Sequence, residues 1–280
     1  MTRTFLTALF VAATVAAPAV AQDDYGHRMH QEHQHETPAA SGATEGEPRV
    51  PVVTEEVVYA SFDGAGVKGY LARPKETSGP LPGLIVIQEW WGLNDNVRAM
   101  TEKLAGEGYV ALAVDLYEGK LGATAGEARA LMEKALGDFP RLMSHLAQAR
   151  SYLAQEAKAT KIGSLGWCFG GAMSLQGAIA LGDDLDAVVV YYGSTVTDPA
   201  ELAKISAPLL GLFGGADTGI PLDGVRAMED GLAKLGKAAT IVVYDGAGHG
   251  FANPSGQSWN PGAADAAWQR ATAFLDEHLR

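Results

Sequence analysis

The sequence contains a single cysteine among 280 residues, so it cannot form an internal disulfide bond. Basic residues are also scarce, with 21 Lys and Arg against 33 Asp and Glu and a net charge of -12. Such an acidic chain offers no basic face to nucleic acid or to anionic membranes. No apolar run reaches the roughly 20 residues of a membrane span. We therefore expect no nucleic-acid partner and no membrane span, and a fold stabilised by its hydrophobic core.

The amino-terminal segment has the pattern of an export signal. It has one arginine near its start, an apolar run from Phe5 to about Val15, and Ala19-Val20-Ala21 as a small-residue cleavage site. This arrangement is typical of a secretory signal peptide, which is removed from the mature protein. We predict a signal peptide over residues 1–21 and a periplasmic or secreted location.

Residues 22–51 have almost no large apolar side chains and are rich in Gln, Glu, Pro, Ser and Gly. A segment of this composition cannot bury enough surface to fold by itself, so we predict a disordered leader. The leader holds four of the seven histidines, namely His27, His30, His33 and His35. Clustered imidazoles can bind a transition metal weakly, but a polar linker without a specific role is the simpler interpretation.

Residues 52–280 alternate short, continuous Val, Ile and Leu runs with helical patterns, and we predict one domain there. The first two apolar runs flank Asp63-Gly64, which predicts a hairpin. Continuous apolar strands are typical of a parallel sheet covered on both faces. We predict an α/β fold, a mostly parallel, doubly wound sheet with helices on both faces.

The cysteine lies at a junction between two predicted elements. The run KIGSLGW predicts a strand that ends just before Cys168, and FGGAMSLQGAIA predicts a helix that begins just after it. A G-x-nucleophile-x-G sequence at such a turn is the nucleophile elbow of α/β-hydrolases, here with Cys in place of the usual Ser. The amino terminus of the helix favours the thiolate. A buried structural cysteine is the alternative interpretation.

The partners of such a nucleophile follow in the chain order nucleophile, acid, base. His249 lies on a glycine-rich loop after the predicted strand ATIVVYDG, which makes it the candidate base. Asp217 lies just after another buried strand and is the preferred acid. Asp245 also falls between Cys168 and His249 and is a competitor.

These residues stand in motifs that resemble the dienelactone hydrolase family, the carboxymethylenebutenolidases of the α/β-hydrolase superfamily. The motifs are, in order, IVIQEWWGLN, GYVALAVDLY, GWCFGG, and GGADTGIP followed by YDGAGHGF. The resemblance extends from about residue 57 to residue 279. It implies a Cys-Asp-His triad formed by Cys168, Asp217 and His249.

The resemblance also implies roles for residues around the triad. Glu89 matches a glutamate that contacts the cysteine and regulates its ionisation, and the backbone N–H groups of Trp90 and Phe169 match the oxyanion hole. The family holds a substrate carboxylate with arginines, but Asn253 stands at one such position here, so the substrate is predicted to be neutral or larger. Arg129 is a possible match for a second arginine. Trp91, like Trp90, is either pocket wall or core.

The implied reaction is hydrolysis of a small-molecule ester or lactone through a thioester acyl-enzyme, with no metal and no organic cofactor. We also predict a monomer. Two alternatives remain open. The protein is a general exported carboxylesterase that acts on another substrate class, or it is not an enzyme and uses its thiol and its histidine-rich leader to bind metal or thiol-reactive ions.

Overall fold

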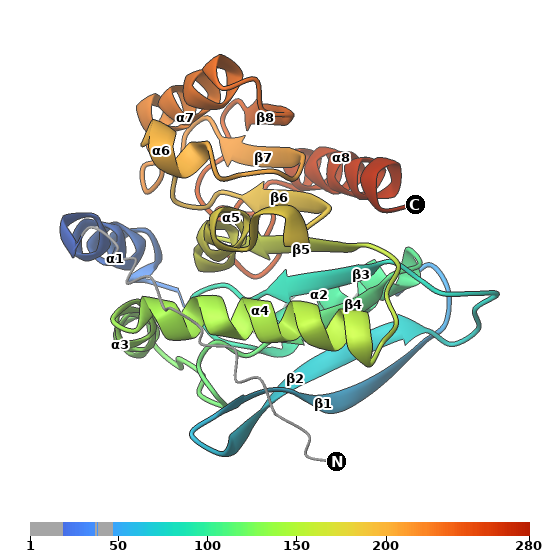
Figure 1. Ribbon diagram of the computed structural model, residues 1–280. Helices are drawn as coiled ribbons and strands as arrows, with labels where there is room; N and C mark the ends of the chain where they lie inside the picture. Colours follow the sequence, from blue (N-terminus) through green and yellow to red (C-terminus); the bar gives the residue numbers. More distant parts are fainter. Residues whose placement is uncertain (1–18, 37, 39–46) are drawn as a thin grey trace, which may run out of the picture.

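The structure of the protein is a computed structural model that describes residues 19–36, 38 and 47–280. The predicted signal peptide therefore lies outside the described residues, apart from its last residues from Ala19 on. Figure 1 shows a central sheet with helices packed against it. In the described part of the chain, no helix combines the length and the apolar character that crossing a membrane requires.

The central layer is an eight-stranded sheet with the order β1-β2-β4-β3-β5-β6-β7-β8. The strands are Val52–Phe62 (β1), Ala65–Pro74 (β2), Gly83–Ile87 (β3), Val110–Val114 (β4), Ile162–Trp167 (β5), Ala187–Tyr191 (β6), Leu209–Gly214 (β7) and Ala239–Tyr244 (β8). From β4 to β8 neighbouring strands are parallel, whereas β1 and β2 form an antiparallel edge. The predicted mostly parallel sheet is confirmed.

The helices that follow the strands are α2 (Asp95–Gly106), α3 (Ala125–Leu136), α4 (Phe139–Gln155), α5 (Phe169–Leu181), α6 (Pro199–Leu202), α7 (Leu222–Lys234) and α8 (Pro261–Leu279). In Figure 1, α4 and α5 cross in front of the sheet and α2 lies behind it. Every residue of β3 to β7 is buried. This burial on both faces explains the continuous apolar runs in the sequence.

The predicted hairpin is also present. β1 and β2 pair in antiparallel register on either side of Asp63 and Gly64, which have φ angles of 52° and 82°. Two consecutive residues with positive φ are the requirement of a tight turn that matches the twist of the flanking strands.

The prediction of a disordered leader is wrong for its first part. Residues Ala19–His33 form helix α1, which packs beside α3 (Figure 1). Tyr25, Met29 and His33 are buried, and their spacing of four residues places them on one face of α1. The leader has too few apolar residues for a core of its own, but these side chains pack instead onto the carboxyl edge of the sheet.

Candidate active site

The turn between β5 and α5 has the geometry of a nucleophile elbow. Cys168 has φ 54° and ψ -117°, a conformation that a side chain other than glycine rarely adopts. A Cβ atom on Gly166 would lie 2.3 Å from the backbone of Gly170, and one on Gly170 would lie 2.3 Å from the carbonyl oxygen of Ile87. Only glycine fits at these two positions, because the turn presses the start of α5 against the sheet.

The parallel strands bring two further predicted residues to the same edge of the sheet. Asp217 follows β7 and His249 follows β8, and both side chains are buried. Nδ1 of His249 donates to Oδ2 of Asp217 across 2.9 Å, while the backbone N–H of Ile220 donates to Oδ1 across 2.8 Å. The competing acid, Asp245, is exposed. Of the two candidate acids, the structure therefore joins Asp217 to His249.

Burial and the neighbouring charges shift the pKa of the Cys168 thiol in opposite directions. Burial raises the pKa of Cys168, but the neighbouring imidazoles of His249 and His33 outweigh it and lower the pKa to about 6. Burial alone would lower the pKa of His249, yet the Cys168 sulfur and the Asp217 carboxylate raise it well above its ordinary value. The pair is therefore stable as a thiolate and an imidazolium, a state in which the sulfur is a ready nucleophile.

The leader covers this sulfur, which the sequence interpretation missed. The Tyr25 hydroxyl lies 4.0 Å and Sδ of Met29 lies 3.5 Å from Sγ of Cys168. The ring centroid of His33 lies 5.0 Å from that of Trp90 and 5.3 Å from that of His249. A Tyr, a Met and a His at spacings of four residues were the signal for this helix, but it is weak in a polar segment.

Polar contacts outside the elbow fix α1 and the residues after it. Nε of Arg28 donates to the Gly219 carbonyl across 2.9 Å, and the Thr218 hydroxyl donates to Glu32. After the helix, the backbone N–H of Gln257 donates to Oε1 of Glu36 across 2.9 Å. The leader is thus attached to the loops that follow β7 and β8, which also carry Asp217 and His249.

Glu89 follows β3 and is joined to Asn253, which is predicted to stand at the position of a family arginine. Nδ2 of Asn253 donates to Oε2 of Glu89 across 2.7 Å. In the part of the chain that the structure describes, Glu89 makes no hydrogen bond to Cys168. Burial, and then the negative charge on Cys168, raise the pKa of Glu89 to about 7. Glu89 is therefore close enough to sense the charge on the sulfur without touching it.

The other predicted site residues fall into two groups. Trp90 and Trp91 are buried beside His33, and Phe169 opens α5, where the first backbone N–H groups of a helix have no acceptor within it. Arg129 instead lies on α3, where its Nε is 2.6 Å from Oε1 of Glu133. It is not among the residues that surround the cysteine.

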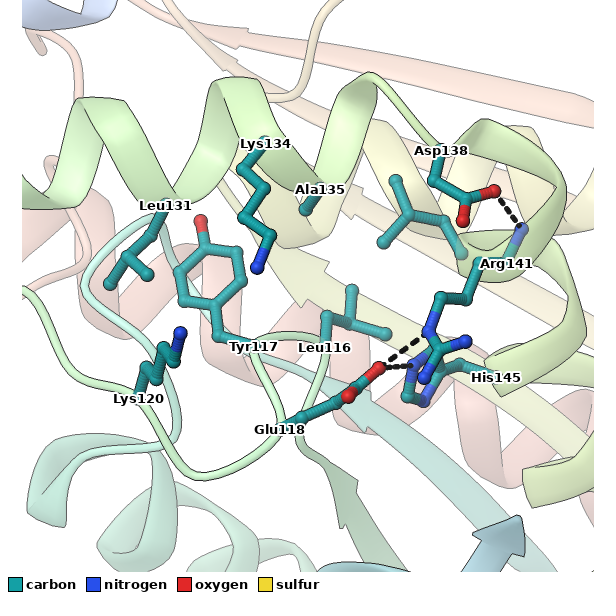
Figure 2. A pocket seen from close by; sticks show the side chains of 11 residues that line it. Leu116, Tyr117, Glu118, Lys120, Leu131, Lys134, Ala135, Asp138, Arg141 and His145 are labelled. Carbon is teal, nitrogen blue, oxygen red and sulfur yellow. Dashed lines mark hydrogen bonds and ion pairs between the residues drawn. The ribbon is translucent and has the colours of Figure 1, made fainter. Parts of the chain in front are cut away.

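A cavity beside the elbow region is separate from the cysteine. A cavity of about 330 Å³ lies between the loop after β4 and helices α3 and α4 (Figure 2). Glu118 there is 2.6 Å from Nε of Arg141 and 3.5 Å from Nε2 of His145. The ring of Tyr117 lines this cavity and packs 5.7 Å from the ring of Phe169. Tyr117 is thus the wall between the cavity and the elbow.

The chain is similar to known proteins over most of its length. The family model described as the dienelactone hydrolase family matches residues 67–279. A protein of Saccharolobus solfataricus named "Putative carboxymethylenebutenolidase" is 30% identical over 79% of this chain and 98% of its own, and the Escherichia coli K12 protein of the same name is 30% identical over 80% and 89%. A crystal structure from Klebsiella pneumoniae, described as a "Putative Dienelactone Hydrolase", is 30% identical in sequence. Its TM-score is 0.73, and the match covers 81% of this chain and 99% of that one.

Proposed function

The chain belongs to the dienelactone hydrolase family and is a hydrolase of ester or lactone bonds, and on that premise we propose that Cys168 is its nucleophile. The observation that carries the proposal is the buried thiol at a strained strand-to-helix turn, beside the hydrogen-bonded pair of His249 and Asp217. A strained, low-pKa thiol next to an oriented imidazole is the arrangement that covalent acyl transfer needs.

In the proposed reaction, the Cys168 thiolate attacks the substrate carbonyl and forms a carbon–sulfur bond. The backbone N–H groups of Trp90 and Phe169 stabilise the oxyanion, a contribution of about 3–4 kcal/mol for each donor. The carbon–oxygen bond of the ester breaks, and the leaving oxygen takes the proton from the His249 imidazolium. His249 then accepts a proton from water, which attacks the thioester and restores the thiolate, while Asp217 holds the imidazole tautomer.

The covering leader adds one requirement to this reaction. Tyr25 and Met29 lie against Sγ of Cys168, in the space that a substrate carbonyl must enter. Catalysis therefore requires α1 to move away from the elbow or to be displaced by the substrate. Apparent substrate affinity is then reduced by the fraction of molecules in which the leader covers the sulfur.

For the substrate class, we propose an ester or lactone that is neutral, or larger than a small carboxylated dienelactone. The support is that the Asn253 amide is already bonded to Glu89 and that Arg129 is already paired with Glu133. Neither side chain is poised to hold a substrate carboxylate by a bidentate charge-assisted pair. An exported carboxylesterase is the second candidate, and export itself rests on the signal-like residues 1–21.

The test of the nucleophile is a set of variants with a trapped intermediate. Cys168→Ala should abolish hydrolysis of p-nitrophenyl acetate while the protein stays folded, and Cys168→Ser should retain little activity. Intact-mass spectrometry of His249→Gln incubated with the ester should show one acetyl group on Cys168, because the base that activates water is missing. Full activity in Cys168→Ala would refute the assignment.

The substrate class is tested by comparing kcat/KM for dienelactone, neutral lactones and short acyl esters in the wild type and in Asn253→Arg. We expect Asn253→Arg to raise kcat/KM for dienelactone relative to kcat/KM for the neutral esters, since a partly buried charged hydrogen bond contributes about 1.5–3 kcal/mol. A wild type that already prefers dienelactone strongly, with no gain from the arginine, would show that the charge argument is wrong.

A further inference from the structure

Two histidines and the cysteine form a cluster that the proposed reaction does not fully use. His33, Cys168 and His249 each offer one ligand atom, and these atoms lie within 4.8 Å of one another. All three residues are buried. The reaction needs Cys168 and His249 but has no role for His33, which the leader supplies.

Both imidazoles are oriented in the same way. Nδ1 of His33 lies 2.7 Å from Oε2 of Glu36, just as Nδ1 of His249 lies 2.9 Å from Oδ2 of Asp217. Each carboxylate therefore accepts from Nδ1 and leaves Nε2 as the nitrogen that can bind a metal once its proton has left. Both Nε2 atoms are buried and make no hydrogen bond. A carboxylate behind each imidazole is the usual support of a histidine that ligates a metal.

A fourth donor comes from the same face of α1. Sδ of Met29, one helical turn before His33, lies 3.5 Å from Sγ of Cys168. Thiolate and thioether donors select soft ions such as Cu(I), and imidazole is a common copper ligand. We propose that His33, Cys168 and His249, with Met29 as a weaker fourth ligand, bind one Cu(I) ion between the leader and the elbow.

Such an ion would switch the hydrolase off. The ligands must be a thiolate and two neutral imidazoles, so the protons that these groups share leave to solvent when the metal binds. The lone pairs of the sulfur and of Nε2 of His249 are then used in metal bonds. The ion also fixes α1 over the elbow, because His33 and Met29 belong to the leader. Metal and substrate therefore exclude each other.

The site goes beyond the proposed function, since it would bind metal even if Cys168 were not the nucleophile. The primary measurement is the Cu(I) affinity of the mature full chain under anaerobic conditions, by competition with a chromophoric Cu(I) chelator. We expect one ion per chain and a loss of about 100-fold or more in His33→Gln. Glu36→Gln should weaken binding by about 10- to 100-fold, the usual effect of losing a supporting partner.

His35→Gln is the matched control, because His35 is an exposed histidine of the same segment. It should bind Cu(I) like the wild type. Equal affinity in wild type and His33→Gln would overturn the proposal, since the leader would then contribute no ligand. A loss in His35→Gln as large as in His33→Gln would overturn it too, by showing adventitious binding to leader histidines.

Met29→Leu separates a ligand role from a packing role, because leucine fills similar space without the sulfur. It should lower Cu(I) affinity by a larger factor than Zn(II) affinity, since the thioether is a soft donor. Equal losses for both ions would remove Met29 from the ligand set and with it the preference for copper. Hydrolysis of p-nitrophenyl acetate without metal, measured on the same samples, tests the catalytic proposal separately.

Discussion

Two buried histidines of this protein differ in charge, one protonated and one neutral, although a carboxylate lies beside each of them. His249 is held by Asp217 at the elbow, and its pKa is raised well above the ordinary value. His145 lies on the wall of the cavity in Figure 2, with Glu118 at 3.5 Å, and burial lowers its pKa to about 4. Both side chains are almost completely inaccessible to water.

The difference comes from what else the carboxylate touches. Asp217 is buried; one of its oxygens accepts from His249 and the other from the backbone N–H of Ile220, so its charge acts directly on His249. Glu118 is partly exposed and already paired with Arg141, whose positive charge opposes protonation of His145. Burial then decides the state of His145, while a second anion, the Cys168 thiolate, decides that of His249. Two anions thus face His249, whereas His145 faces one carboxylate that is already paired with a cation, and burial keeps His145 neutral.

The largest effect should come from replacing the two histidines in parallel. His249→Gln should lower kcat/KM for p-nitrophenyl acetate by roughly 10²- to 10⁴-fold, the usual contribution of a general base. His145→Gln should stay within about 3-fold of wild type, because its region carries no reacting group. Initial rates on samples matched by circular dichroism check this pair. Similar losses in both variants would mean that the cavity takes part in the reaction.

Sequence alone separates these two histidines only by their place in the chain. His249 follows a predicted strand, whereas His145 lies in a helical pattern before Cys168, and the chain order nucleophile, acid, base favours His249. The bounds of α3 were also predictable, because its apolar spacing is regular and Thr124 caps its amino terminus. The covering of Cys168 by α1 was not predictable, because the few apolar residues of α1 are buried against the rest of the domain and give no strong periodic pattern in the sequence. The four-residue helix α6 is too short to give a periodic pattern.

The second effect concerns stability against acid. His145 has a pKa of about 4 in the folded protein and about 6.5 when unfolded, so the unfolded chain binds more protons between these values. The free energy of unfolding should therefore fall as the pH drops from 6.5 to 4, by about 3 kcal/mol from this group. Urea unfolding of wild type and His145→Gln across this range should show a flatter dependence in the variant. Parallel curves would show that folding does not change the pKa of His145.

A smaller effect should come from removing the side chains of α1 that cover Cys168. Tyr25→Ala with Met29→Ala removes two leader side chains that lie against the sulfur, whose burial contributes about 1.5–3 kcal/mol each. Part of this energy stabilises the state in which the leader covers Cys168. Its loss should therefore raise kcat/KM for bulky esters by about 10-fold. His27→Ala is the control, because His27 is exposed on the same helix. An unchanged kcat/KM in the double variant would mean that the leader leaves the elbow at no cost.

The smallest effect compares two tyrosines that line the two regions. The Tyr59 hydroxyl shares a hydrogen bond of 2.6 Å with Nδ1 of His145, whereas the buried Tyr117 hydroxyl has no partner among the described side chains. Tyr59→Phe leaves a buried imidazole nitrogen unsatisfied and should cost about 1–3 kcal/mol, while Tyr117→Phe removes an unsatisfied group and should be neutral or stabilising by about 1 kcal/mol. Urea unfolding at pH 7 measures both. If Tyr117→Phe costs as much as Tyr59→Phe, then the cavity supplies a partner, such as an ordered water, and the wall between cavity and elbow is polar rather than inert.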